Sequence, residues 1–135
     1  MIFSVARRVR FQDIDAAGIL FFARAFEYFH DTYLALLEAR GIDVPRVIRE
    51  GAWGAPLGHA EADFSAPMRY GDPIRVAIER GEIGRSSLSV FYRVHEEADP
   101  SRVFCTGKMV HVFIDVATRR PRAVPDDIRV VFEIH

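Results

Sequence analysis

The chain has only one cysteine, Cys105, among its 135 residues, which excludes an internal disulfide framework and fits a reducing compartment. It has no excess of either charge, since 18 basic and 19 acidic residues leave a net charge of -1. It also lacks an apolar run of the roughly 20 residues that span a bilayer, and residues 1–8 do not form a signal peptide. We therefore expect a cytoplasmic protein that binds neither nucleic acid nor membrane.

Several catalytic motifs are missing too. The five histidines include no H-E-x-x-H pair and no Cys/His pair at zinc spacing, so we expect no metal. Segment 81–87 lacks the lysine of a phosphate loop, and Ser86 and Ser87 lack the G-x-S-x-G elbow of a serine hydrolase. Cys105 has no nucleophile signature and is interpreted as a small buried residue.

The N-terminal third changes its hydrophobic period once. Alternating apolar residues over 3–11 predict a half-buried strand. Over 20–40 the apolar residues recur at spacings of three and four, which predicts a helix roughly 30 Å long with one apolar face. Gly41 follows as a helix stop. Such a helix needs a broad apolar surface to cover it.

The remainder is dominated by strand patterns. Strands are predicted over 59–64, 74–78, 88–94 and 103–115. Gly81 and Gly84 are interpreted as breaks between strands, and residues 98–101 as a hairpin loop. A short helix is expected after Pro125. Short turns favour antiparallel pairing, so we predict a single α+β domain over residues 1–135, with one long helix packed on an antiparallel sheet.

Asp13 and Asp15 lie between the first strand and the long helix, in the pattern D-x-D-x-x-G that ends at Gly18. If the backbone is extended there, both carboxylates point the same way. One interpretation is that they cap or start the helix, because acids are favoured at helix N-termini. The other is that one carboxylate is reactive, beside unpaired backbone amides that polarise a carbonyl oxygen.

Two other groups have competing interpretations. His30, on the predicted helix, is expected to be a polar, partly buried helix residue rather than a ligand. Arg119, Arg120 and Arg122 form a basic cluster that is either a solvated turn or a site for a phosphate-bearing ligand.

Taken together, these segments resemble the 4-hydroxybenzoyl-CoA thioesterase family of hotdog-fold enzymes. The resemblance is carried by the D-x-D-x-x-G segment with the Phe-rich helix after it, by residues 54–57, by residues 64–72 and by residues 123–128. It implies an antiparallel sheet wrapped around one long central helix. It also implies a homodimer with its sheets joined edge to edge, or a homotetramer, and active sites at the subunit interface.

The same resemblance assigns roles to residues around the helix start. It makes Asp15 the catalytic acid, either as the nucleophile on the thioester carbonyl or as the general base that activates water. It places the oxyanion donor at the backbone amide of Phe22, where many side chains are tolerated. Gly18 lets the turn pass close to the thioester, and Asp13 is interpreted as structural.

The substrate is expected to be an acyl-CoA, hydrolysed to the free acid and CoA, with no separate cofactor. The resemblance suggests Arg85, Arg120 and Arg122 as partners of the CoA phosphates, with Arg119 as a substitute for Arg120. Phe22, Phe26 and His30 are expected to line a pocket for an aromatic or a short to medium acyl group. Because His30 replaces the acid that meets the ring hydroxyl in 4-hydroxybenzoyl-CoA enzymes, that substrate is not favoured.

Two alternatives remain. A hotdog protein can bind an acyl-CoA or an acyl carrier protein without cleaving it, although such a binder has no need of Asp15. Hydratase chemistry on the same fold is less favoured, because the chain has no His/Asp pair at the spacing that such enzymes use.

Overall fold

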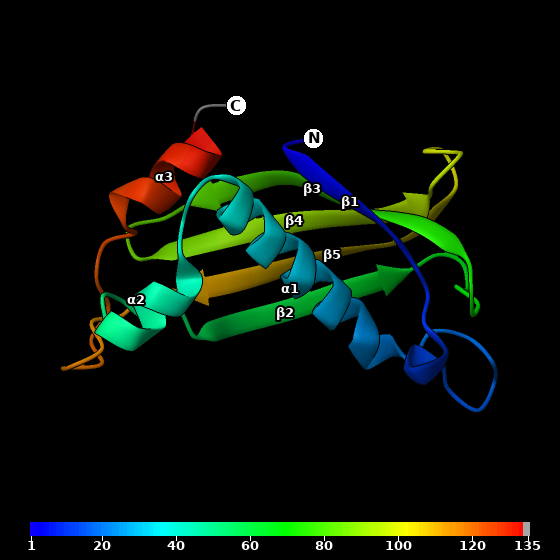
Figure 1. Cartoon of the computed structure of the whole chain (residues 1–135), viewed down its shortest axis with the longest axis horizontal. Coiled ribbons are helices and arrows are strands. Elements are labelled where there is room, and N and C mark those ends of the chain that lie inside the picture. The colour runs from blue at the N-terminus through cyan, green and yellow to red at the C-terminus, as the bar shows by residue number, and fades with distance from the viewer. Residues whose placement is uncertain (134–135) are drawn as a thin grey trace.

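The computed structural model of the chain describes residues 1–133. It contains a five-stranded antiparallel sheet with the strand order β1-β3-β4-β5-β2. The strands are β1 (Phe3–Arg8), β2 (Leu57–Phe64), β3 (Pro73–Ile83), β4 (Ser87–Glu96) and β5 (Val103–Val112). The long helix α1 (Phe22–Ala39) lies across one face of this sheet (Figure 1). The predicted α+β architecture, an antiparallel sheet wrapped around one long helix, is confirmed.

Three shorter helices complete the fold. A 3-10 turn, η1 (Phe11–Asp13), joins β1 to the loop before α1, and α2 (Val44–Glu50) follows α1. The terminal helix α3 (Asp126–Glu133) packs beside β3 at one end of the sheet (Figure 1). None of the helices within residues 1–133 is long and apolar enough to cross a membrane.

The apolar face of α1 packs on the sheet as its periodicity predicts. Phe29 and Leu36 are fully buried, and the ring of Phe29 stacks on Tyr92 of β4, with the centroids 4.7 Å apart. On β5, a Cβ at Gly107 would overlap the Phe29 ring. The absence of a side chain at this position therefore lets α1 pack close to the sheet. The exception is Phe22, whose side chain is 61% exposed at the helix start.

Three predicted boundaries are wrong. The strand predicted over 103–115 ends at Val112, after which Ile114 forms only isolated bridges. The first strand ends at Arg8, and Phe11 lies in η1 with its ring 69% exposed against Tyr70. The cause is a local turn, in which the Asp13 amide donates to the Arg10 carbonyl. Gly81 does not break a strand either: β3 continues through it, and a side chain there would overlap the Phe132 ring of α3.

Strand β2 forms one edge of the sheet and pairs only with β5 within residues 1–133. Most of its residues are exposed, including Leu57 and Phe64. An open strand edge carries unpaired backbone groups that a second strand can bind. The edge runs between the two ends of the molecule, from the α2 end at Leu57 to the η1 end at Phe64 (Figure 1).

Candidate active site

The loop between η1 and α1 forms a tight turn around Asp15. The Gly18 amide donates to the Asp15 carbonyl at 3.0 Å, and the Asp15 amide donates to the Ile19 carbonyl at 2.8 Å. Gly18 has a φ of +80°, a conformation that glycine adopts without steric cost. A Cβ at Gly18 would meet nothing within 4 Å. Glycine is therefore favoured at this position by its backbone conformation and not by a lack of room for a side chain.

The Asp15 carboxylate is half-buried and held by main chain. Its Oδ1 accepts hydrogen bonds from the amides of Ala17 at 2.8 Å and Ile19 at 3.4 Å. Within residues 1–133 no hydrogen bond reaches its Oδ2. One oxygen therefore fixes the orientation of the carboxylate, and the other has no hydrogen-bond partner among these residues.

Helix α1 begins at Phe22 without a side-chain cap, because the N-cap residue is Phe21. The capping interpretation of Asp13 and Asp15 is therefore wrong. The Phe21 amide donates to the Asp13 carbonyl at 2.9 Å, whereas the Phe22 amide forms no hydrogen bond within residues 1–133. Free amides at a helix start, with the helix dipole behind them, stabilise negative charge on a nearby oxygen.

Asp15 and Phe22 line the same hollow, which has a volume of about 360 Å³. The rest of its lining is almost entirely apolar and comes from Ile19, Leu20 and the segment 64–68 that follows β2. The two loops are tied together, since the Leu20 amide donates to the Met68 carbonyl at 2.7 Å. The hollow thus joins a carboxylate, a free helix-start amide and an apolar surface.

The two aspartates do not point the same way, contrary to the prediction for an extended backbone. The 3-10 turn directs Asp13 into the protein, where its side chain is fully buried, and Asp15 toward the hollow. Burial by itself raises the pKa of the Asp13 carboxyl, but hydrogen bonds from Arg10 and Tyr28 lower that pKa below its usual value. Asp13 is therefore a buried anion with its own partners.

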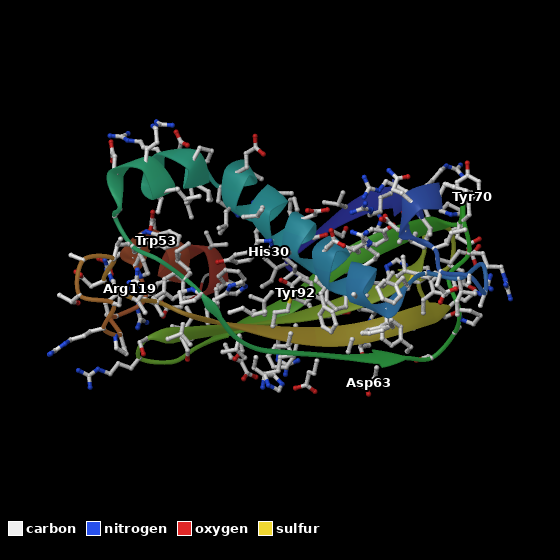
Figure 2. All side chains as sticks on the ribbon, turned by 90° about the horizontal axis from the view of Figure 1, so that it is seen from below. His30, Trp53, Asp63, Tyr70, Tyr92 and Arg119 are labelled. Carbon is white, nitrogen blue, oxygen red and sulfur yellow. The ribbon has the colours of Figure 1, made fainter. Side chains whose placement is uncertain are left out.

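The residues expected in the acyl pocket lie deeper along α1. Neither Phe26 nor His30 lines the hollow at Asp15. Phe26 packs edge-on against Phe29, and His30 lies near Tyr33 and His111 under the helix. Figure 2 shows His30 between α1 and the sheet. His30 is partly buried, and this burial lowers the pKa of its imidazole.

The arginines expected at the CoA phosphates lie at the end of the folded molecule opposite Asp15. Arg85 belongs to the β3–β4 turn, and its carbonyl accepts from the Val124 amide at 3.2 Å. Arg120 and Arg122 follow β5 in the same region, where Arg122 donates to the Ala123 carbonyl. Figure 2 shows the neighbouring Arg119 at one end and Tyr70 at the opposite end. One chain alone does not bring these arginines to Asp15.

Away from the hollow, Cys105 and the candidate metal ligands show no sign of a second reactive centre within residues 1–133. Cys105 is buried, and burial raises the pKa of its thiol to about 12. In residues 1–133 no three His, Cys, Asp or Glu side chains gather in a way that would hold a metal ion. Residues 64–68 were not predicted as site residues, although they belong to the motif that carries the family resemblance. Their position depends on the packing of two loops far apart in sequence.

Comparisons with known proteins agree with this fold. The model of the Thioesterase-like superfamily matches residues 9–132. The 1,4-dihydroxy-2-naphthoyl-CoA hydrolase of Rippkaea orientalis is 34% identical over 84% of this chain and 83% of its own length. The hydrolase of the same name from Nostoc punctiforme is 33% identical over 95% of this chain and 84% of its own length.

Solved structures show the same arrangement. The crystal structure of a 1,4-dihydroxy-2-naphthoyl-CoA thioesterase from Synechocystis superposes with a TM-score of 0.88, at 24% identity, over 96% of this chain and 93% of that one. That likeness establishes the hotdog fold. The relatives named here act on a naphthoyl thioester, so the narrower resemblance to enzymes of 4-hydroxybenzoyl-CoA is not confirmed.

Proposed function

We propose that this chain, which belongs to the Thioesterase-like superfamily, hydrolyses the thioester of an aromatic acyl-CoA to the free acid and CoA. Its relatives with 33% and 34% identity are named as CoA thioester hydrolases, so the enzyme class is that of an acyl-CoA thioester hydrolase. The proposal rests chiefly on one observation, that the Asp15 carboxylate and the unpaired Phe22 amide line the same hollow.

In the proposed reaction the thioester carbonyl carbon lies near Asp15, and its oxygen accepts a hydrogen bond from the Phe22 amide. An oxygen, from Asp15 itself or from a water that Asp15 deprotonates, attacks the carbon. The carbon–sulfur bond then breaks, and the CoA thiolate leaves and takes up a proton. If Asp15 is the nucleophile, water hydrolyses the acyl-enzyme anhydride and returns the carboxylate. Gly18 shapes the turn that presents Asp15.

An aromatic acyl group suits the apolar lining of the hollow. The rings of Phe22 and Phe64 and the side chain of Met68 contribute to that lining, and flat rings pack well against aromatic and thioether groups. The names of the relatives make 1,4-dihydroxy-2-naphthoyl-CoA the first compound to try. Phe26 and His30 are proposed to lie at the deep end of the acyl site.

We propose that the working unit is a homodimer, or a homotetramer built from it, joined through the free edges of β2. Antiparallel pairing of two β2 strands sets the Leu57 end of one chain beside the Phe64 end of the other. That arrangement carries Arg85, Arg120 and Arg122 of one subunit toward Asp15 of its partner. The site then has both the thioester chemistry and guanidinium groups for the CoA phosphates.

Other parts of the proposal follow from the sequence. Residues 1–135 form one hotdog thioesterase domain, and the enzyme needs no cofactor because CoA is part of the substrate. A pantetheine thioester on an acyl carrier protein is the alternative substrate. We also propose a cytoplasmic location, which fits a chain with a single cysteine.

Release of free thiol from a panel of aromatic, short and long acyl-CoAs tests the proposal. We expect turnover to be fastest with the aromatic thioesters and to be nearly abolished in Asp15→Asn, with the fold intact by circular dichroism. Activity retained in Asp15→Asn removes the catalytic assignment. Tight binding of acyl-CoA with no thiol release by the wild-type protein favours the non-catalytic binder instead.

A further inference from the structure

Asp13 makes an unusually complete set of contacts for a residue outside the hollow. Its side chain is fully buried. The Tyr28 hydroxyl donates to its Oδ2 at 2.6 Å, and the Arg10 guanidinium donates to Oδ2 at 2.9 Å and to Oδ1 at 3.2 Å. Arg24 lies 3.7 Å from Oδ1. A buried carboxylate with this many charged and polar partners has little freedom to move.

These contacts attach η1 to the first two turns of α1. Arg24 and Tyr28 both belong to α1, whereas Asp13 and Arg10 lie at η1. The Asp13 carbonyl accepts from the amide of Phe21, the N-cap residue of α1, at 2.9 Å. Asp13 therefore binds the helix start through its side chain and through its main chain.

Both reacting groups of the site are next to this anchor. Phe21 directly precedes Phe22, and its backbone torsion sets the direction of the Phe22 amide. Asp15 is two residues after Asp13, across the residue Ile14, which bridges to Leu20 on the other side of the turn. A shift of Asp13 relative to α1 would change the distance between the Asp15 carboxylate and the Phe22 amide.

We propose, on the basis of the proposed function, that Asp13 and Tyr28 are positioning residues, which hold the Phe22 amide and the Asp15 carboxylate at the spacing that thioester hydrolysis requires. They touch neither substrate nor reacting atoms. Displacement of a reacting group by about 1 Å lowers a rate by about 100-fold. A rigid, buried support for such groups is what an efficient site needs.

Tyr28 is held independently of its hydroxyl, which makes a clean test possible. The Arg7 guanidinium lies over its ring at 3.5 Å and also pairs with Asp31 at 3.2 Å. Tyr28→Phe keeps the ring and this cation–π contact and removes the hydroxyl, which donates to Asp13 and accepts from the Arg10 amide at 3.4 Å. Asp13→Asn keeps the shape of the side chain and removes its charge.

The first measurement is steady-state kinetics on an aromatic acyl-CoA that the wild-type enzyme hydrolyses. For Tyr28→Phe and Asp13→Asn we expect kcat to fall by about 10- to 100-fold, with KM changed by less than about twofold. Glu97→Gln is the control, because it removes a partly buried ion pair with Arg75 that lies outside the site. This control is expected to lower thermal stability without lowering kcat.

The second measurement reports the hydrogen bond between the thioester carbonyl and the Phe22 amide. In Asp15→Asn the thioester remains bound, and the infrared stretch of a 13C-labelled carbonyl reports its polarisation by the Phe22 amide. Adding Tyr28→Phe to Asp15→Asn is expected to move this band toward its position in free substrate. Adding Glu97→Gln is expected to leave the band in place.

The outcomes separate this inference from the function on which it rests. No thiol release by the wild-type protein, or full activity in Asp15→Asn, overturns the proposed function. If the wild-type protein is active and Asp15→Asn is not, the positioning role is tested alone. It is overturned when Tyr28→Phe leaves kcat and the carbonyl band unchanged, or lowers activity only by the fraction of protein that is unfolded.

Discussion

The imidazole of His111 on β5 stacks on the ring of Tyr33 on α1, with the centroids 4.7 Å apart and the planes 15° apart. The ring of His30 lies close to both, with its centroid 5.8 Å from that of His111 and 6.0 Å from that of Tyr33. His111 is buried, and this burial, together with the neighbouring His30, lowers its pKa to about 4. The two histidines form a neutral contact between helix and sheet.

This contact predicts a loss of stability in acid. Above pH 6.5 His111 is neutral in both the folded and the unfolded chain, so it adds no pH dependence. As the pH falls from 6.5 toward 4, the unfolded chain takes up the proton first, and unfolding becomes easier by about 3 kcal/mol at pH 4. Urea unfolding of wild-type and His111→Phe protein between pH 7 and pH 4 measures the difference.

His59→Gln is the control for this experiment, because His59 lies on the exposed strand β2 and pairs with Glu61 at the surface. We expect His59→Gln to keep the wild-type pH dependence and His111→Phe to flatten it. Equal slopes for His111→Phe and wild-type protein contradict a buried neutral imidazole at this position.

The turn at Gly18 predicts that a substitution of this glycine lowers activity more than it lowers stability. Alanine at a φ of +80° costs about 1 kcal/mol of backbone strain, and relief of that strain would displace Asp15. Gly41 has the same φ and equally open surroundings at the end of α1. Gly18→Ala and Gly41→Ala should therefore lose similar stability, measured by thermal unfolding, and only Gly18→Ala should lose thiol release. If Gly18→Ala and Gly41→Ala release thiol at equal rates, the prediction is contradicted.

The approach of α1 to β5 predicts a steric defect at Gly107. A Cβ there would overlap the Phe29 ring, so Gly107→Ala should destabilise the protein by about 2 kcal/mol or more. The smaller side chain in Phe29→Leu relieves the overlap, and the double variant should be more stable than the sum of the single effects predicts by about 1 kcal/mol. Chemical unfolding of the four proteins measures this coupling, and strict additivity contradicts it.

The proposed dimer predicts complementation between two inactive proteins. Asp15→Asn lacks the acid, and a chain with Arg85, Arg120 and Arg122 all replaced by alanine lacks the phosphate partners. If each site combines Asp15 of one subunit with arginines of the other, a mixed dimer contains one intact site. Refolding the two chains together at equal amounts should restore about a quarter of wild-type activity at low substrate concentration.

Each of these two chains refolded alone is the control for complementation. A mixture no more active than the separate chains shows that the arginines do not serve the partner's Asp15. Sedimentation of the mixture confirms that dimers have formed, so that a negative result concerns the site and not the assembly.

Sequence patterns predicted the elements around the site well, since most depend on short-range spacing. The helical period over 20–40 comes within two residues of α1, because residues three and four apart share one helix face. The strand period failed at Phe11 because the chain enters a local 3-10 turn there, in which the Asp13 amide donates to the Arg10 carbonyl. The Tyr28 hydroxyl, 15 residues later, donates to the Asp13 side chain that this turn directs inward. Gly81 was misjudged because its partner, Phe132, is 51 residues away in the chain.

The sequence by itself determined the order of the five strands, the long helix and the terminal helix, the apolar face of α1, and the acid-glycine turn directly before the helix. Only the tertiary structure decided which aspartate is buried and which lines the hollow, that residues 64–68 complete that hollow, and that the arginines lie at the far end of the same chain. The physical reason is that periodicity is a property of neighbouring residues. Burial and proximity depend instead on how segments far apart in the chain pack against one another.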